Sequence, residues 1–175
     1  MIRVASQLTY FSPQKILRNT VIERDIDNFI TQIYSLNDRN VESAQTFFFD
    51  GIISAELISI KLNSSTKNVH NSLMNYSYWD LSQHLPLEIK TPDKPLIIDF
   101  GANSISEIND KLPRLTSVLI DFSIFDLIAA CVFYPAIALG KTNNLTLNHQ
   151  HKLILWENAD LVNNRLFSNT KLRVI

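Results

Sequence analysis

Two groups of polar residues have types and spacings that could support catalysis or metal binding. His149 and His151 are two residues apart, so a strand would place both imidazoles on one side, as in half of a metal site. No third ligand follows at a recognisable spacing, and we expect surface or hinge histidines and no metal site. Asp99 ends an apolar, strand-like run, where a carboxylate can belong to a site or can simply cap the next turn.

An acidic pair lies in the N-terminal part of the chain. If this segment is a helix, Glu23 and Asp27 lie four residues apart on one face, while Asp25 points elsewhere. Such a pair could serve a hydrolase, imitate an acidic substrate on the surface of an inhibitor, or form ordinary helix surface. We take Glu23 and Asp27 as candidate partner-binding residues.

Aromatic residues are densest at Tyr76, Tyr78 and Trp79, followed by Asp80, a candidate helix cap. Amphipathic aromatic side chains are enriched in binding hot spots, because they contribute a large area at a low entropy cost. Packing of the same rings over the core is an equal alternative. Tyr76, Tyr78, Trp79 and Asp80 complete the predicted partner-binding surface.

Composition excludes several classes of function. The chain has only three glycines, and their isolation rules out a P-loop, a dinucleotide fingerprint and a nucleophile elbow. We therefore expect no cofactor. The net charge is −1 with mixed signs along the chain, which gives no electrostatic footprint for nucleic acid or a membrane. No apolar run of signal-peptide length begins the chain, which predicts a cytoplasmic protein.

The longest apolar stretch, residues 118–139, predicts a central buried helix. Its length could span a bilayer, but Asp121, Asp126 and Pro135 oppose insertion. In a buried helix Asp121 can act as the N-cap, or both carboxylates can reach donors outside the core. Cys131 lies inside this stretch and is expected to be a buried thiol rather than a nucleophile.

Most of the segments that carry the candidate site residues have sequence patterns typical of helices. A capping box at Thr20 begins a predicted amphipathic helix that ends near Asn37, and a more buried helix follows over residues 40–62, with Gly51 at a close helix crossing or a bend. Further helices are predicted over 67–76 and 104–112, the latter ended by Pro113. Short extended segments fit 87–90 and 96–100, while the C-terminal region predicts either strands at 145–147, 153–156 and 172–175 or one helix over 149–167. We therefore expect a mainly α fold, a single-domain helical bundle over residues 1–175 with a few short β-strands in the C-terminal half.

In its size and composition, the chain resembles bacterial toxin-immunity proteins of the contact-dependent growth inhibition type. The resemblance rests on small size, abundant Asn and Ile, scarce glycine and no assembled catalytic motif, and it carries over no residue by position. It implies a one-to-one complex with a cognate toxin domain, often a nuclease, whose active site the protein covers. Acidic helix faces would suit a basic toxin, although the near-neutral charge departs from strongly acidic examples.

Two other classes of function remain open. A small hydrolase could use Asp99, Asp121 or Asp126 with His149 or His151 if the fold brings them together. A chaperone or adaptor could present an apolar surface to a partner segment. We expect protein binding rather than catalysis, and the sequence leaves the partner and the oligomeric state open.

Overall fold

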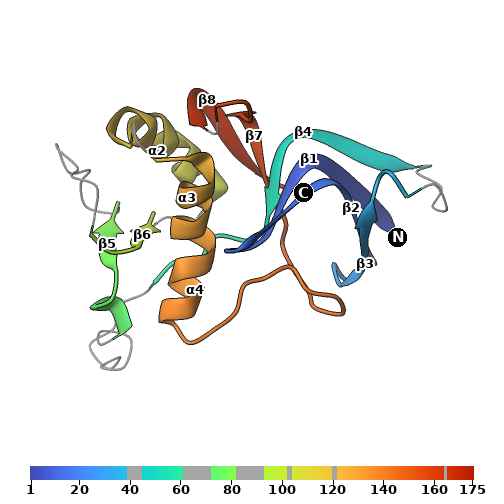
Figure 1. Ribbon diagram of the computed structural model, residues 1–175, viewed down its shortest axis with the longest axis horizontal. Helices are drawn as coiled ribbons and strands as arrows, with labels where there is room; N and C mark the ends of the chain where they lie inside the picture. Colours follow the sequence, from blue (N-terminus) through green and yellow to red (C-terminus); the bar gives the residue numbers. More distant parts are fainter. Residues whose placement is uncertain (39–44, 61–71, 82–92, 102–103, 120–121, 164) are drawn as a thin grey trace.

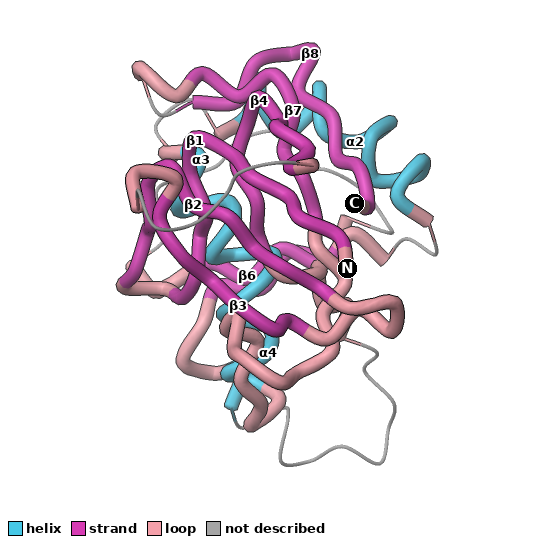
Figure 2. Tube along the Cα trace, turned by 90° about the vertical axis from the view of Figure 1, so that its right-hand side faces the viewer, coloured by secondary structure: helices cyan, strands magenta, loops and turns pink. Residues whose placement is uncertain are grey.

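The structure, a computed structural model, is mainly β, and the prediction of a helical bundle is wrong (Figures 1 and 2). Among the described residues, 43% are in strands and 22% in helices. The described residues are 1–38, 45–60, 72–81, 93–101, 104–119, 122–163 and 165–175. Their strands are β1 (Ile2–Ser12), β2 (Lys15–Arg24), β3 (Ile30–Ser35), β4 (Thr46–Ser54), β5 (Ser77–Asp80), β6 (Leu96–Asp99), β7 (Ile154–Asp160) and β8 (Arg165–Val174); their helical elements are α2 (Ile105–Val118), α3 (Ile124–Ile128), the π-helix η1 (Ala129–Phe133) and α4 (Tyr134–Ala138).

Six strands form one mixed sheet in the order β3-β2-β1-β4-β7-β8. The pair β1 and β4 is parallel, and every other neighbouring pair in this sheet is antiparallel. The β5 and β6 strands form a separate parallel pair on the other side of the helices (Figure 1). The predicted extended segment at 96–100 is therefore confirmed as β6, whereas the one at 87–90 lies outside the described residues.

The segment before β7 passes beside the β3 edge of the sheet. The backbone N–H of Ile30 donates to the carbonyl of His149, and the N–H of Asn148 donates back to the carbonyl of Ile30. Further along, Gln150 forms an isolated bridge with Phe29. These bonds pair the outer edge of β3 locally with a loop.

The central apolar helix predicted over 118–139 is confirmed over a shorter range, as a helical run from Ile124 to Ala138 made of α3, η1 and α4. Ser123 caps it, and the side chain of Asp126 accepts the N–H of Ser123 to complete a capping box; Asp121 lies outside the described residues. Every residue of η1 is buried, Cys131 among them, and burial raises the pKa of the Cys131 thiol. A neutral, buried thiol agrees with a structural role.

Helix α2 packs against β8 and begins where the capping signal predicts. The Ser104 hydroxyl accepts the N–H of Glu107. The predicted end at Pro113 is wrong, because the helix continues to Val118 with Pro113 inside it. Buried Leu112 and Leu115, on either side of Pro113, anchor the helix in the core and offset the hydrogen bond that proline removes.

The two predicted N-terminal helices are strands. Residues 20–37 contribute to β2 and β3, joined by a turn in which Asp25 Oδ1 accepts the N–H groups of Asp27 and Phe29. Residues 46–54 of the second predicted helix form β4. Both faces of β2 are buried near its end, so its apolar residues do not alternate, and the sequence imitates a helical stripe.

In the C-terminal region, the strands predicted at 153–156 and 172–175 are confirmed by β7 and β8, whereas the strand predicted at 145–147 and the helix over 149–167 are wrong. The first half of the third predicted helix, 67–71, lies outside the described residues, and in the second half only residues 72 and 73 are helical. Among the helices that the structure does describe, none is long and apolar enough to cross a membrane.

Candidate functional site

The first half of β4 is paired on one side only among the described residues. On its inner side, Thr46–Phe49 pairs with β1 over Arg3–Ser6. On its outer side, β7 pairs with β4 only over Gly51–Ser54. We call Thr46–Phe49 the β4 edge; in Figure 1 this part of β4 arches away from β7 at the top of the sheet.

Two large aromatic side chains are exposed on the β4 edge. Phe47 is 63% exposed and Phe48 is 62% exposed. Because successive side chains of a strand point to opposite faces, the two rings flank the strand on both sides. Natural edge strands are usually protected by charge, proline or a bulge, and Thr46–Phe49 carries neither a charged residue nor a proline.

Gly51 marks the point where β7 and β4 come into contact. Its φ is +141°, and a Cβ at this position would overlap the carbonyl oxygen of Trp156 on β7. The close approach expected at Gly51 is therefore present, but it is to a strand rather than to a helix. Past Glu157 the β7–β8 register shifts at a bulge, and Asn158 takes φ +58°. No other strand of the described ranges pairs with the β4 edge on that side.

A basic side chain lies at the end of the β4 edge. The guanidinium of Arg173 lies 5.1 Å from the ring centroid of Phe49, and it also forms an ion pair with Glu157 at 2.9 Å. Arg173 and Phe49 thus form a cation–π contact that fixes the position of the half-buried Phe49 ring. This leaves Phe47 and Phe48 as the exposed apolar surface.

The predicted acidic pair does not form one face. Glu23 is in β2 and only 2% exposed; its carboxylate forms an ion pair with Arg3 and accepts a hydrogen bond from the Tyr34 hydroxyl at 2.9 Å. Asp27 lies instead in the exposed turn after β2. The helix face that we expected is absent because this segment is a hairpin, so Glu23 is a structural ion-pair residue.

The aromatic segment 76–80 packs against the rest of the protein and is not fully exposed to solvent. Its residues are all half-buried, with Tyr76 packed against Tyr134 and Trp79 against the main core. The hydroxyl of Tyr78 donates to Asp99 Oδ2 at 2.9 Å. These contacts favour the packing alternative, while partner binding by Tyr76, Tyr78, Trp79 and Asp80 stays a prediction.

Asp99 is the most extensively hydrogen-bonded carboxylate of the strand-end candidates. It is 3% exposed, and Oδ1 accepts from the Ser59 hydroxyl and the Gly101 N–H, both at 2.9 Å. Oδ2 accepts from the Ile60 N–H at 2.8 Å in addition to the Tyr78 hydroxyl. With these four hydrogen bonds, the Asp99 carboxylate links β6 to the segment after β4, which indicates a structural role.

Asp99 and the two histidines proposed for a hydrolase are not brought together, whereas Asp126 belongs to the Ser123 capping box and Asp121 lies outside the described residues. Asp99 is at the end of β6, whereas His149 and His151 lie in the loop beside β3, across the helical run (Figure 1). The two imidazole centroids are 6.4 Å apart, and burial together with the charge of His149 lowers the pKa of His151. Within the described part of the chain, no group of three His, Cys, Asp or Glu could hold a metal ion.

Comparison with known proteins gives no family for this chain. The sequence matches no known family and no curated protein. A solved structure of N-acetyl-D-glucosamine-6-phosphate deacetylase from Mycobacterium smegmatis matches with 4% identity and a TM-score of 0.29, over 67% of this chain and 29% of the enzyme. The chain thus spans less than a third of that enzyme, and the TM-score is too low to relate the two folds or activities.

The sequence interpretation missed the β4 edge because it assigned Phe47 and Phe48 to a buried helix. Three successive phenylalanines fit a buried helix as well as a strand whose side chains alternate between its two faces. A usable signal was nevertheless present. The run Thr46–Phe49 is rich in residues that favour strands, and it is followed by a glycine of the kind that marks close backbone approach.

Proposed function

We propose that this protein binds a partner protein by adding an extended segment of that partner to the β4 edge. The observation that carries the proposal is the one-sided pairing of Thr46–Phe49 together with the exposure of Phe47 and Phe48. A strand laid along this edge would gain main-chain hydrogen bonds and cover both rings. This is the general mode of strand addition, in which the backbone gives affinity and alternate side chains give specificity.

The apolar rings set the scale of the interaction. Fully burying one exposed phenylalanine is worth roughly 1.5–3 kcal/mol, so the two rings together supply a substantial share of the binding free energy. The edge itself carries no charge, while Asp50 and Arg173 lie at its end. An apolar segment with few charges is therefore the partner chemistry that fits, which agrees with the adaptor or chaperone alternative.

The immunity hypothesis is a narrower form of the same proposal. Under it, the segment bound at the β4 edge belongs to a cognate toxin domain, and the complex forms at one-to-one stoichiometry. The textural resemblance of the sequence supports testing toxin domains first. The hydrolase alternative has no comparable support in the described residues, because Asp99 lies apart from the two histidines and Asp126 is part of a helix cap.

The proposal is tested by capture from host lysate with three tagged proteins, followed by binding measurements with the purified partner. The proteins are the wild type, Phe47→Lys/Phe48→Lys, and a control, Ile26→Lys/Val162→Lys, which changes two exposed apolar residues outside the edge. We expect a partner that binds the wild type and the control equally and the edge variant at least tenfold more weakly. Equal binding by the folded edge variant would exclude the β4 edge as the binding surface.

A further inference from the structure

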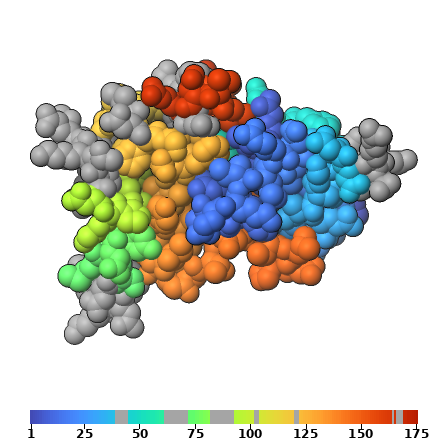
Figure 3. All heavy atoms as spheres, in the orientation of Figure 1, coloured from blue at the N-terminus to red at the C-terminus, as the bar shows by residue number. Residues whose placement is uncertain are grey.

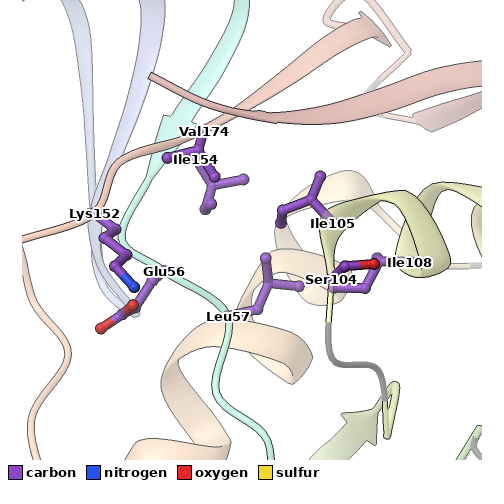
Figure 4. Close-up of a pocket in the computed structure, with 8 residues that line it drawn as sticks. All are labelled: Glu56, Leu57, Ser104, Ile105, Ile108, Lys152, Ile154 and Val174. Atoms are coloured by element: carbon purple, nitrogen blue, oxygen red, sulfur yellow. The ribbon is translucent and has the colours of Figure 1, made fainter.

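A pocket opens where the start of α2, the start of β7 and the end of β8 meet (Figure 4). Its apolar wall comes from one side chain of the segment after β4, two of α2, and one each of β7 and β8. Those residues are Leu57, Ile105, Ile108, Ile154 and Val174.

The pocket is small, with a volume of about 200 Å³, below the roughly 300–1,000 Å³ of most pockets for drug-sized ligands. It therefore suits a ligand smaller than a typical drug. The floor is firm, because Ile108 and Ile154 are buried in the core, and Ile154 pairs with Val174 across β7 and β8. An aliphatic group placed here would replace water against a preformed apolar surface.

Two opposite charges lie at one end of this apolar wall. Figure 4 shows the side chains of Glu56 and Lys152 together at the end of the pocket away from α2. Both side chains are exposed, and neither forms an ion pair with another residue of the described chain. The backbone of Glu56 is held in place, since Asn143 Nδ2 donates to its carbonyl at 2.8 Å. The pocket therefore presents one carboxylate and one ammonium group next to an aliphatic wall.

We propose that this pocket binds a small aliphatic zwitterion, a molecule with the chemistry of a free aliphatic α-amino acid. Its ammonium group pairs with Glu56, its carboxylate pairs with Lys152, and its branched side chain packs between Ile105 and Ile154. A ligand with a single charge pairs with only one of Glu56 and Lys152. A ligand without an aliphatic body leaves the apolar wall exposed to water. Both deficits reduce affinity relative to the zwitterion.

The test is a titration of the 175-residue protein with L-leucine at millimolar concentrations, followed by methyl NMR. Saturable shifts are expected for the methyl groups of Ile105, Ile154 and Val174. Three comparison ligands separate the contributions: isoamylamine lacks the carboxylate, isocaproate lacks the ammonium group, and glycine lacks the aliphatic body. Each is expected to bind more weakly than leucine.

Two variants assign the charges. Glu56→Gln should weaken leucine about two- to fivefold and leave isocaproate unchanged, whereas Lys152→Gln should weaken leucine similarly and leave isoamylamine unchanged. Lys141→Gln, another exposed lysine, is the matched control and should bind leucine as the wild type does. The proposal is overturned if leucine gives no saturable shifts, if isocaproate binds as tightly as leucine, or if neither charge variant changes the affinity for leucine.

Discussion

At the residue scale, Gly51 controls how closely β7 can approach β4. Because a Cβ would overlap the Trp156 carbonyl and φ is positive, we expect Gly51→Ala to lower the free energy of unfolding by at least about 2 kcal/mol, from strain and overpacking together. Gly140→Ala is the control: its φ is +68°, but its Cβ would meet nothing within 4 Å, so only the backbone cost of about 1 kcal/mol applies. Denaturant unfolding that shows equal losses for the two variants would contradict the close approach.

Asp99 gives a second prediction at this scale. Asn in its place turns one acceptor oxygen into an NH₂ group; if that group takes the Oδ2 position, it faces the Ile60 N–H, which cannot reorient. We expect Asp99→Asn to cost about 2 kcal/mol or more, measured by chemical denaturation. Tyr78→Phe removes one of the four donors and should cost about 1 kcal/mol. An Asn variant as stable as the wild type would show that the four bonds do not hold β6 in place.

Tyr10 makes stability fall at alkaline pH. Burial, with smaller effects from Tyr134 and Asp126, raises the pKa of Tyr10 from 10.0 to about 12. Between these values the unfolded chain ionises at Tyr10 while the folded chain holds the proton, so stability is complete below pH 10 and declines as pH rises toward 12. Unfolding measured across this range should decline less steeply for Tyr10→Phe than for the wild type. Identical slopes would mean that Tyr10 titrates alike in both states.

At the scale of elements, the exposed rings of the β4 edge should contribute little to folding. Phe47 and Phe48 are about 60% exposed, so we expect Phe47→Lys/Phe48→Lys to change the free energy of unfolding by less than about 1 kcal/mol. Thermal and denaturant unfolding check this directly. A large loss would indicate that the rings pack in the native fold, and the variant would then no longer report on binding alone.

The elements also show which parts of the fold the sequence could predict. The Ser104 cap is a local signal, and the helix predicted after it is present, whereas the cap of the central helix is Ser123 and not the predicted Asp121. The buried run around Cys131 was equally predictable, because only a core helix suits so long an apolar stretch with internal carboxylates. Pro113 shows the limit of such signals, since tertiary packing of Leu112 and Leu115 carries α2 past it.

The N-terminal strands could not be predicted from local pattern. Val21 and Ile22 are both fully buried although they point to opposite faces of β2, so the alternation that identifies a strand is missing. Non-local pairing, as between the distant strands β1 and β4, decides such a segment. The same reasoning explains the errors at the candidate site. Glu23 was expected on the surface of a helix but is buried in β2, and Phe47 was expected in a buried helix but is exposed on β4.

At the scale of the whole molecule, the two proposed sites lie on separate regions. The β4 edge is the first half of β4, whereas the pocket is lined by residues after β4 and by residues of α2, β7 and β8. In the space-filling view, α2 and β4 lie on either side of β8 (Figure 3). Binding at one can therefore be measured in variants of the other. We expect Phe47→Lys/Phe48→Lys to bind leucine as the wild type does, and Lys152→Gln to retain the partner protein.

The central claim is that a partner strand adds to the β4 edge, and amide hydrogen exchange of the protein with and without its captured partner tests it most directly. Strand addition hydrogen-bonds outward-facing amides of Thr46–Asp50, so exchange there should slow markedly in the complex, while exchange at Gly51–Ser54, already paired with β7, should change little. A stable complex in which exchange over Thr46–Asp50 is unchanged, and protection appears elsewhere, would contradict the account.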